Sequence, residues 1–143
     1  MNARITEILN DHEVSEAALH DAFDEMLDDV TEAVRIGSLE YSPSVVLKAV
    51  DPTAYRCGFV DWLDGEGAYV EIEGSHYKRE ELREALEELA DELNREAEAI
   101  QEELDELRQE EPENTKDYDA RNRDHAAILA EAKEVEDFIW NNL

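Results

Sequence analysis

Two stretches of the sequence decide the fold: residues 79–110, REELREALEELADELNREAEAIQEELDELRQE, and residues 118–139, YDARNRDHAAILAEAKEVEDFI. In the first stretch, apolar side chains recur every three or four positions, at Leu82, Leu86, Leu89, Leu93, Ala97, Ile100, Leu104 and Leu107. The second stretch keeps this spacing, at Tyr118, Arg121, His125, Ile128, Ala132, Val135 and Ile139. Such spacing is typical of amphipathic α-helices. Because a short polar connector separates the two stretches, we expect a long antiparallel helical hairpin over residues 79–143.

The two predicted helices depart from a regular coiled coil in two respects. The step of four residues from Leu93 to Ala97 breaks the heptad phase, which predicts local unwinding at that point. Arg121 and His125 are basic residues on an otherwise apolar stripe. They predict ion pairs between the helices, or an edge where the hairpin meets another chain. Pro112 ends the first helix, because proline cannot continue it.

Shorter helices are expected before the hairpin. Ser15 is a good N-cap, and the apolar spacing that follows it predicts a helix through Val34 that stops at Gly37. Ser42-Pro43 and Asp51-Pro52 each combine a capping residue with a proline at the first helical position. They predict the starts of two further helices.

One stretch alternates like a strand. Val70 and Ile72 alternate with glutamates, and Glu73-Gly74-Ser75 supplies a turn. We therefore expect one small β-hairpin at about residues 68–78. A hairpin of this size is marginal alone, so it needs a helix to pack on.

These elements predict a mainly α chain in two parts. The N-terminal part, residues 1–78, contains helices plus one small β-hairpin and carries the globular core. The second part, residues 79–143, is the antiparallel helical hairpin. Extra apolar residues flank the seam of the hairpin, so the chain is also expected to self-associate as a homo-oligomer.

The most specific string lies in the N-terminal part, where residues 51–62 read DPTAYRCGFVDW. A structural role accounts for it: Asp51 caps a helix, a proline starts the helix, and the aromatic residues fill a core. Cys57 lies among these apolar neighbours and is expected to be a buried, inert thiol. Arg56 and Asp61 are expected to pair with each other or to bind a partner.

This string, with its Asp-Pro, Ala-aromatic-Arg, Gly and Asp-aromatic elements, resembles a short motif of small phage and plasmid proteins of unknown function. The resemblance spans roughly residues 45–81, which include the predicted β-hairpin and Tyr77. Those proteins have no established activity. The resemblance therefore implies no reaction, cofactor or catalytic residue.

Negative charge dominates the composition. The 143 residues include 40 Asp and Glu against 13 Lys and Arg, for a net charge of −27, and only four of the basic residues are Lys. This acid-rich, Lys-poor composition resembles that of proteins from halophilic archaea and their viruses; an ordinary acidic protein is the alternative. Phosphate and anionic lipid repel such a charge, so we expect neither direct nucleic-acid binding nor membrane binding. A protein partner with a basic surface is favoured.

The acidic stretches suggest two further hypotheses. Residues 80–111 carry fifteen acids and three arginines. Their net charge of −12, spread over roughly 48 Å of helix, gives about one negative charge per 4 Å, whereas duplex DNA carries about one per 1.7 Å. A DNA-mimic anti-defence inhibitor, which occupies a basic nucleic-acid-binding groove, is therefore an alternative that needs several acidic faces to combine. A second acidic ridge, which could attract Mg²⁺ or Ca²⁺, consists of Asp21, Asp24, Glu25, Asp28 and Asp29. No loop resembles an EF-hand, however, and we expect no metal site.

No motif indicates catalysis. The sequence lacks a Gly-rich phosphate loop, G-x-S-x-G, H-E-x-x-H and a cysteine pair, so we expect neither an enzyme nor a cofactor. It also lacks an apolar run of membrane-spanning length and the apolar core of a signal peptide. We therefore expect a cytoplasmic location, or the virion if the protein is viral.

The sequence thus predicts a non-enzymatic acidic interaction protein, with a viral origin in a high-salt organism as part of the hypothesis. It would bind a protein partner, or itself, through the helical hairpin. The candidate partner-binding residues are Arg56, Asp61, Arg121, His125, Asp21 and Asp28.

Overall fold

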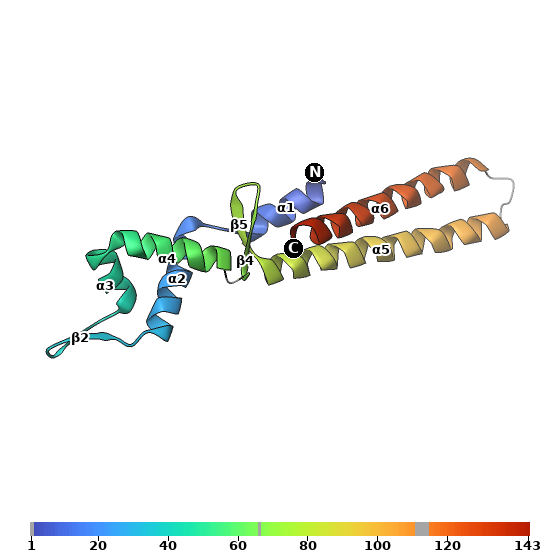
Figure 1. Ribbon diagram of the computed structural model, residues 1–143. Coiled ribbons are helices and arrows are strands. Elements are labelled where there is room, and N and C mark those ends of the chain that lie inside the picture. Colours follow the sequence, from blue (N-terminus) through green and yellow to red (C-terminus); the bar gives the residue numbers. More distant parts are fainter. Residues whose placement is uncertain (1, 66, 111–114) are drawn as a thin grey trace. The chain divides into compact units, whose positions relative to one another are not determined.

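The computed structural model of the chain describes residues 2–65, 67–110 and 115–143 (Figure 1). Helices dominate this part, and the predicted mainly α fold is confirmed. The helices are α1 (Ala3–His12), α2 (Glu16–Val30), α3 (Pro43–Val50), α4 (Pro52–Gly65), α5 (Arg79–Glu110) and α6 (Thr115–Asn142). The strands are β1 (Glu13–Val14), β2 (Val34–Ile36), β3 (Leu39–Tyr41), β4 (Tyr69–Ile72) and β5 (Ser75–Lys78). The chain divides into two compact units: α1 with α5 and α6, and residues 13–79.

The predicted helical hairpin is formed by α5 and α6, which run antiparallel (Figure 1). Its seam is buried along most of α5, at Leu82, Leu86, Leu89, Leu93, Ala97, Ile100 and Leu104. Ala132 and Val135 of α6 are buried as well. Where the spacing predicts local unwinding, between Leu93 and Ala97, α5 remains one α-helix. A continuous apolar seam therefore holds the two helices together.

α1 belongs to the hairpin unit, whereas the sequence groups it with the N-terminal part. Its Ile5 and Leu9 are buried. The Asn2 side-chain amide donates a hydrogen bond to the Glu131 carboxylate of α6 at 3.1 Å, and the Arg4 guanidinium lies 3.5 Å from the same carboxylate. Ile5 and Leu9, four positions apart, lie on one face of α1, but such spacing carries no information about which helices that face packs on.

The unit of residues 13–79 has an aromatic core between α2 and α4. Its buried members are Leu19, Phe23, Tyr55 and Phe59. The Phe23 ring centroid lies 5.3 Å from that of Tyr55 and 5.7 Å from that of Phe59, in tilted and edge-on arrangements. Aromatic quadrupoles favour such arrangements over face-to-face stacking. The aromatic residues of the DPTAYRCGFVDW string, Tyr55, Phe59 and Trp62, thus belong to the core that the sequence predicts.

Side-chain oxygens cap the three helices of this unit. Ser15 and Asp51 accept hydrogen bonds from the backbone N–H three residues further on, at 3.2 and 3.0 Å, as predicted. At α3 the predicted cap, Ser42, makes no side-chain capping bond. Instead Asp28 of α2 accepts from the Ser44 N–H at 2.9 Å and from the Ser44 hydroxyl at 3.1 Å. A side chain from a neighbouring helix therefore takes over the capping role.

The predicted β-hairpin is formed by β4 and β5, and β1 pairs with β5 to make a three-stranded antiparallel sheet. Both central residues of its two-residue turn have positive φ, Glu73 at 52° and Gly74 at 87°. This is the backbone of a type I′ turn, which matches the twist of the flanking strands. Glycine adopts such angles freely, whereas a glutamate side chain is strained there.

The prediction that α2 continues through Val34 is wrong. The helix ends at Val30, because Thr31 turns to extended backbone (φ −118°, ψ 134°). The residues that follow form a second hairpin, in which β2 and β3 pair antiparallel around Gly37, whose φ is +64°. β-Branched Val34 and Ile36 before a two-residue, glycine-containing turn, and aromatic Tyr41 after it, favour strands over a helix.

Cys57 is exposed, so the prediction of a buried thiol is also wrong. The buried residues of α4, Tyr55 and Phe59, lie four positions apart and share one face of the helix. Cys57 stands two positions from each, which places it on the opposite face.

Candidate functional site

A chain of polar side chains links α2, α3 and α4. The Tyr55 hydroxyl donates a hydrogen bond to one oxygen of Asp24 at 2.6 Å, and the Lys48 ammonium pairs with the other oxygen. Lys48 also lies 5.1 Å from the centroid of the Tyr55 ring. His20 Nδ1 lies 3.2 Å from the Tyr55 hydroxyl, and its Nε2 lies 3.6 Å from the Glu16 carboxylate. These five groups form one network that starts in the first turn of α2.

Burial and negative charge fix the protonation state of Tyr55. Desolvation raises its pKa above the ordinary value of 10.0, and the hydrogen bond to Asp24 and the charges of Asp24 and Asp21 raise it further. The hydroxyl therefore stays protonated at physiological pH, with its proton directed at Asp24. A phenol in this state is neither a base nor a nucleophile, and the contacts of the network join α2, α3 and α4. Asp21, a predicted site residue, acts on it through its charge.

An open hollow of about 510 Å³ lies beside this network. It is lined by Glu16, His20, Pro52, Tyr55, Arg56, Phe59 and Val60. The His20 ring stacks on the Phe59 ring at a centroid distance of 4.0 Å. Arg56 is an exposed residue of this lining. Asp61 is exposed and lies five positions further along α4, on another side of the helix. Among the described residues no ion pair joins Arg56 to Asp61.

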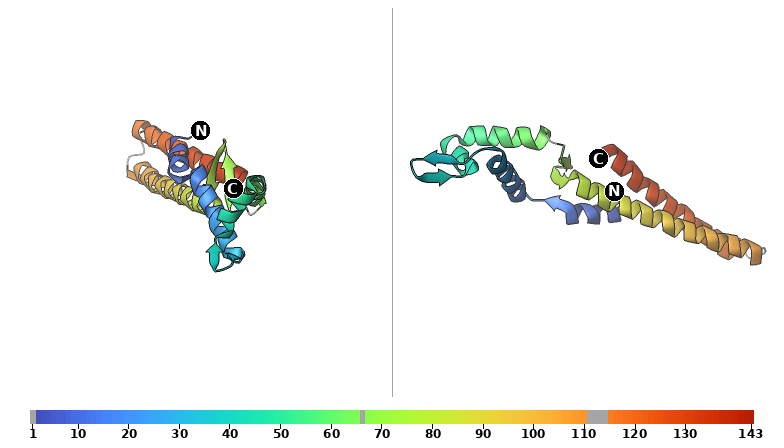
Figure 2. Two further views of the ribbon diagram at one scale, coloured as in Figure 1. Left: turned by 90° about the vertical axis from the view of Figure 1, so that its left-hand side faces the viewer. Right: turned by 90° about the horizontal axis from the view of Figure 1, so that it is seen from below.

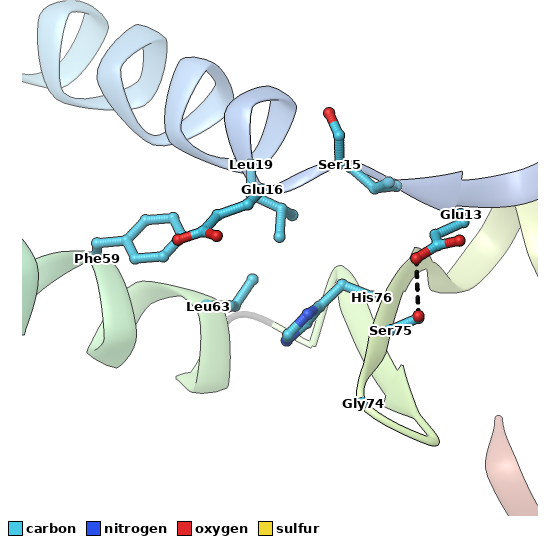
Figure 3. Close-up of a pocket in the computed structure, with 10 residues that line it drawn as sticks. Glu13, Ser15, Glu16, Leu19, Phe59, Leu63, Gly74, Ser75 and His76 are labelled. Atoms are coloured by element: carbon cyan, nitrogen blue, oxygen red, sulfur yellow. Dashed lines mark hydrogen bonds between the residues drawn. The ribbon is translucent and has the colours of Figure 1, made fainter.

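A second hollow, of about 340 Å³, opens between the start of α2, the end of α4 and the β4–β5 turn (Figure 3). It is lined by Glu13, Val14, Ser15, Glu16, Leu19, Phe59, Leu63, Gly74, Ser75 and His76. Figure 3 shows Leu19, Phe59 and Leu63 on α2 and α4 with Glu16 beside them, and it shows Glu13, Ser75 and His76 on the strands β1 and β5. The Ser75 hydroxyl donates to the Glu13 carboxylate at 2.8 Å. Glu16 and Phe59 line both hollows, so the two are neighbours.

The hairpin unit has a different kind of surface feature. Trp140, on the last turn of α6, exposes 88% of its surface. It borders a shallow hollow of about 280 Å³ whose other lining residues are Glu87, Ala90, Asp91, Glu136 and Ile139. The hollow is therefore apolar with an acidic ring. The Asn94 amide donates to Glu136 at 3.2 Å, which holds one member of this ring in place.

Arg121 forms the predicted ion pair between the helices of the hairpin. Its Nε lies 2.5 Å from the Glu103 carboxylate of α5, and its Nη1 lies 3.3 Å from Asp124 one turn along α6. The hydrogen bond to Glu103 is the largest cause that raises the guanidinium pKa. His125 is partly buried, one turn along the same seam. Both predicted site residues therefore lie on the seam that joins α5 and α6.

The acidic ridge of α2 has internal partners. Asp24 is engaged by Tyr55 and Lys48, and Asp28 is engaged by Ser44. In the part of the chain that the structure describes, no three His, Cys, Asp or Glu side chains converge as metal ligands would. In the same part, no helix combines the length and the apolar character needed to cross a bilayer.

Sequence reasoning missed the polar network and the exposure of Trp140. Only the spacing of Glu16 and His20, four residues apart on a predicted helix, signalled a contact. The other bonds of the network join different helices, and local spacing does not report such pairs.

Comparisons with protein-family models, with curated proteins and with solved structures gave no match to this chain. The function therefore has to follow from the chemistry of the chain itself.

Proposed function

We propose that the chain is a non-enzymatic interaction protein whose helical hairpin binds a protein partner. The observation that supports this most directly is Trp140, exposed beside an apolar hollow that α5 and α6 line together. Tryptophan is enriched at the energetic centres of protein contacts, because it buries a large apolar area with few rotatable bonds. A tryptophan left in water is correspondingly unfavourable, so a partner that covers it gains binding free energy.

The acidic ring indicates the chemistry of the partner. Glu87, Asp91 and Glu136 surround the apolar lining of the hollow. A partner that presents an apolar side chain flanked by Lys or Arg would match both the apolar lining and the acidic residues of the hollow. Exposed ion pairs are weak individually and are screened by salt, so the apolar contact has to supply most of the affinity. The net charge of −27 opposes nucleic acid and anionic membranes as partners.

Affinity capture with the full chain tests this function. The bait would be the wild type, Trp140→Ala and, as a control at another exposed apolar position of α6, Leu129→Ala. We expect specific protein partners to be retained by the wild type and by L129A and to be lost with W140A, at both 0.15 M and 1 M NaCl. Identical capture by all three baits, or no specific protein at either salt concentration, would overturn the proposal.

We further propose that the acidity serves solvation in a high-salt cytoplasm, and that a viral chain of this composition would work there or in the virion. At about 1 M salt the Debye length falls to about 3 Å, which removes most of the self-repulsion of a −27 chain. Circular dichroism against NaCl tests this, since helicity should rise with salt. A fold that is equally stable in dilute buffer would contradict it.

The DNA-mimic alternative uses the same acidity for another purpose. Asp24 pairs with Lys48 and Glu103 pairs with Arg121, which lowers the density of unpaired acidic charge below the count of acidic residues. The alternative would be preferred if the captured proteins were nucleic-acid-binding proteins that duplex DNA releases, and if W140A captured them as well as the wild type.

A further inference from the structure

The β2–β3 hairpin has one apolar face and one polar face. Its register pairs Val34 with Tyr41, Arg35 with Glu40 and Ile36 with Leu39. Directly opposed residues, and residues two apart on one strand, point to the same side of a sheet. Val34, Ile36, Leu39 and Tyr41 therefore share one face, which we call the β2–β3 apolar face. The Arg35–Glu40 ion pair, at 2.6 Å, lies on the other face.

The helices of the same unit leave this face largely uncovered. Ile36 exposes 65%, Leu39 56% and Tyr41 40% of their surfaces, and Figure 2 shows β2 and β3 as a separate two-stranded ribbon. Val30 and Val45, on the helices that lead into and out of the hairpin, are exposed as well. An isolated two-stranded hairpin is marginally stable in water without a surface to pack on. The β2–β3 apolar face thus lacks the cover that its stability calls for.

Charge indicates what that cover is. The hairpin itself, residues 34–41, contains one arginine and one glutamate, which pair with each other, so this segment is net neutral in a chain of net −27. A basic partner would find no unpaired acid to bind on this segment, because Glu40 already pairs with Arg35. Two copies of the chain repel each other wherever their acidic surfaces meet, whereas the four residues of the β2–β3 apolar face are all uncharged, and Glu40 pairs with Arg35 on the opposite face. A second copy therefore meets less electrostatic repulsion at this face than at the acidic surfaces of the chain.

We propose that the β2–β3 apolar face is a self-association surface, on which a second copy of this chain packs its own β2–β3 apolar face. A two-fold contact of this kind is isologous, so each copy supplies the same residues and the contact closes at a dimer. A patch of a few exposed side chains covers about 300–600 Å². Because stable interfaces bury about 800 Å² on each partner, the dimer is weak and forms at high micromolar concentrations. Salt strengthens it by screening the repulsion between the copies.

Sedimentation equilibrium of the full chain tests the surface. We expect a monomer–dimer equilibrium whose Kd falls between 0.15 M and 1 M NaCl. The double variant Ile36→Ser with Leu39→Ser leaves the charge unchanged and should raise the dimer Kd by about 100-fold. The control is Val50→Ser with Val60→Ser, which removes exposed apolar side chains outside the hairpin and should leave Kd unchanged. A chain that stays monomeric up to 1 mM in 1 M NaCl, or a dimer that I36S/L39S does not weaken, would overturn the proposal.

Cross-linking keeps the test decisive if the double variant loses its hairpin. In a Cys57→Ser background, Leu39→Cys retains the hairpin register and places a thiol on the β2–β3 apolar face. A short bismaleimide should join two copies of this variant more than tenfold faster in 1 M than in 0.15 M NaCl. Val60→Cys in the same background is the control and should stay uncrosslinked. Equal cross-linking of the two variants would contradict a contact at this face.

Discussion

Replacement of Asp28 by alanine tests whether a side chain from α2 holds the start of α3. Both Asp28 oxygens are used, one by the Ser44 N–H at 2.9 Å and one by the Ser44 hydroxyl at 3.1 Å. Ser44 is buried, with 3% of its surface exposed, so water does not readily replace the lost acceptor. Hydrogen bonds to charged groups contribute about 1.5–3 kcal/mol, and a lost N-terminal cap costs about 0.5–2 kcal/mol. We therefore expect D28A to lower the free energy of unfolding by about 2 kcal/mol.

Urea unfolding in 1 M NaCl, followed by fluorescence, measures this effect. In a Trp140→Phe background Trp62 is the remaining tryptophan, so its signal reports the unit of residues 13–79. A loss of about 2 kcal/mol moves the urea midpoint down by roughly 1 M. Removal of one acid also relieves self-repulsion, and Asp29→Ala, the exposed neighbour, measures that opposing effect. Equal midpoints for D28A and D29A would refute the capping role of Asp28.

Three further predictions follow from single contacts. Tyr55 holds its proton to higher pH in the folded chain than in the unfolded chain, so the free energy of unfolding should fall as pH rises above 10. In urea titrations, Tyr55→Phe should reduce the slope of this free energy against pH by up to about 1.4 kcal/mol per pH unit. Glu73→Asn suits positive φ and should raise thermal stability by about 1 kcal/mol, whereas Asp64→Asn, the same charge change on α4, should not. Arg121→Ala should destabilise the hairpin slightly at low salt, and calorimetry should find no difference from the wild type in 1 M NaCl.

The sequence predicted those elements whose signals are local. The seam spacing of α5, from Leu82 to Leu104, identified the helical hairpin because each seam residue repeats the same short interval. The caps at Ser15 and Asp51 were predictable for the same reason, since the bonded N–H lies three residues away. The Glu73-Gly74 turn was predictable from its glycine and the alternation beside it.

Elements that depend on competition between two local patterns were not predicted. Val30 and Val34 continue the helical spacing of α2, yet residues 34–41, VRIGSLEY, also alternate around a two-residue turn. The strand pattern prevails here: Gly37 adopts a φ of +64° and closes a two-residue turn that pairs Ile36 with Leu39. The capping of Ser44 by Asp28 was likewise unpredictable, because it joins residues 16 positions apart on different helices. For the candidate site this limit is severe, since the Tyr55–Asp24–Lys48 network consists of such contacts.

In a chain of net charge −27, the apolar surfaces are best distinguished by the charges around them. The hollow beside Trp140 is ringed by acids, so a basic partner binds there partly through ion pairs that salt weakens. The β2–β3 apolar face belongs to a hairpin of no net charge, so a second copy binds there against the repulsion of the remaining acidic chain, which salt removes. One titration with NaCl should therefore move the two equilibria in opposite directions: the Kd for the basic partner rises while the Kd of the dimer falls. If both constants moved the same way, charge would not be what separates the two surfaces.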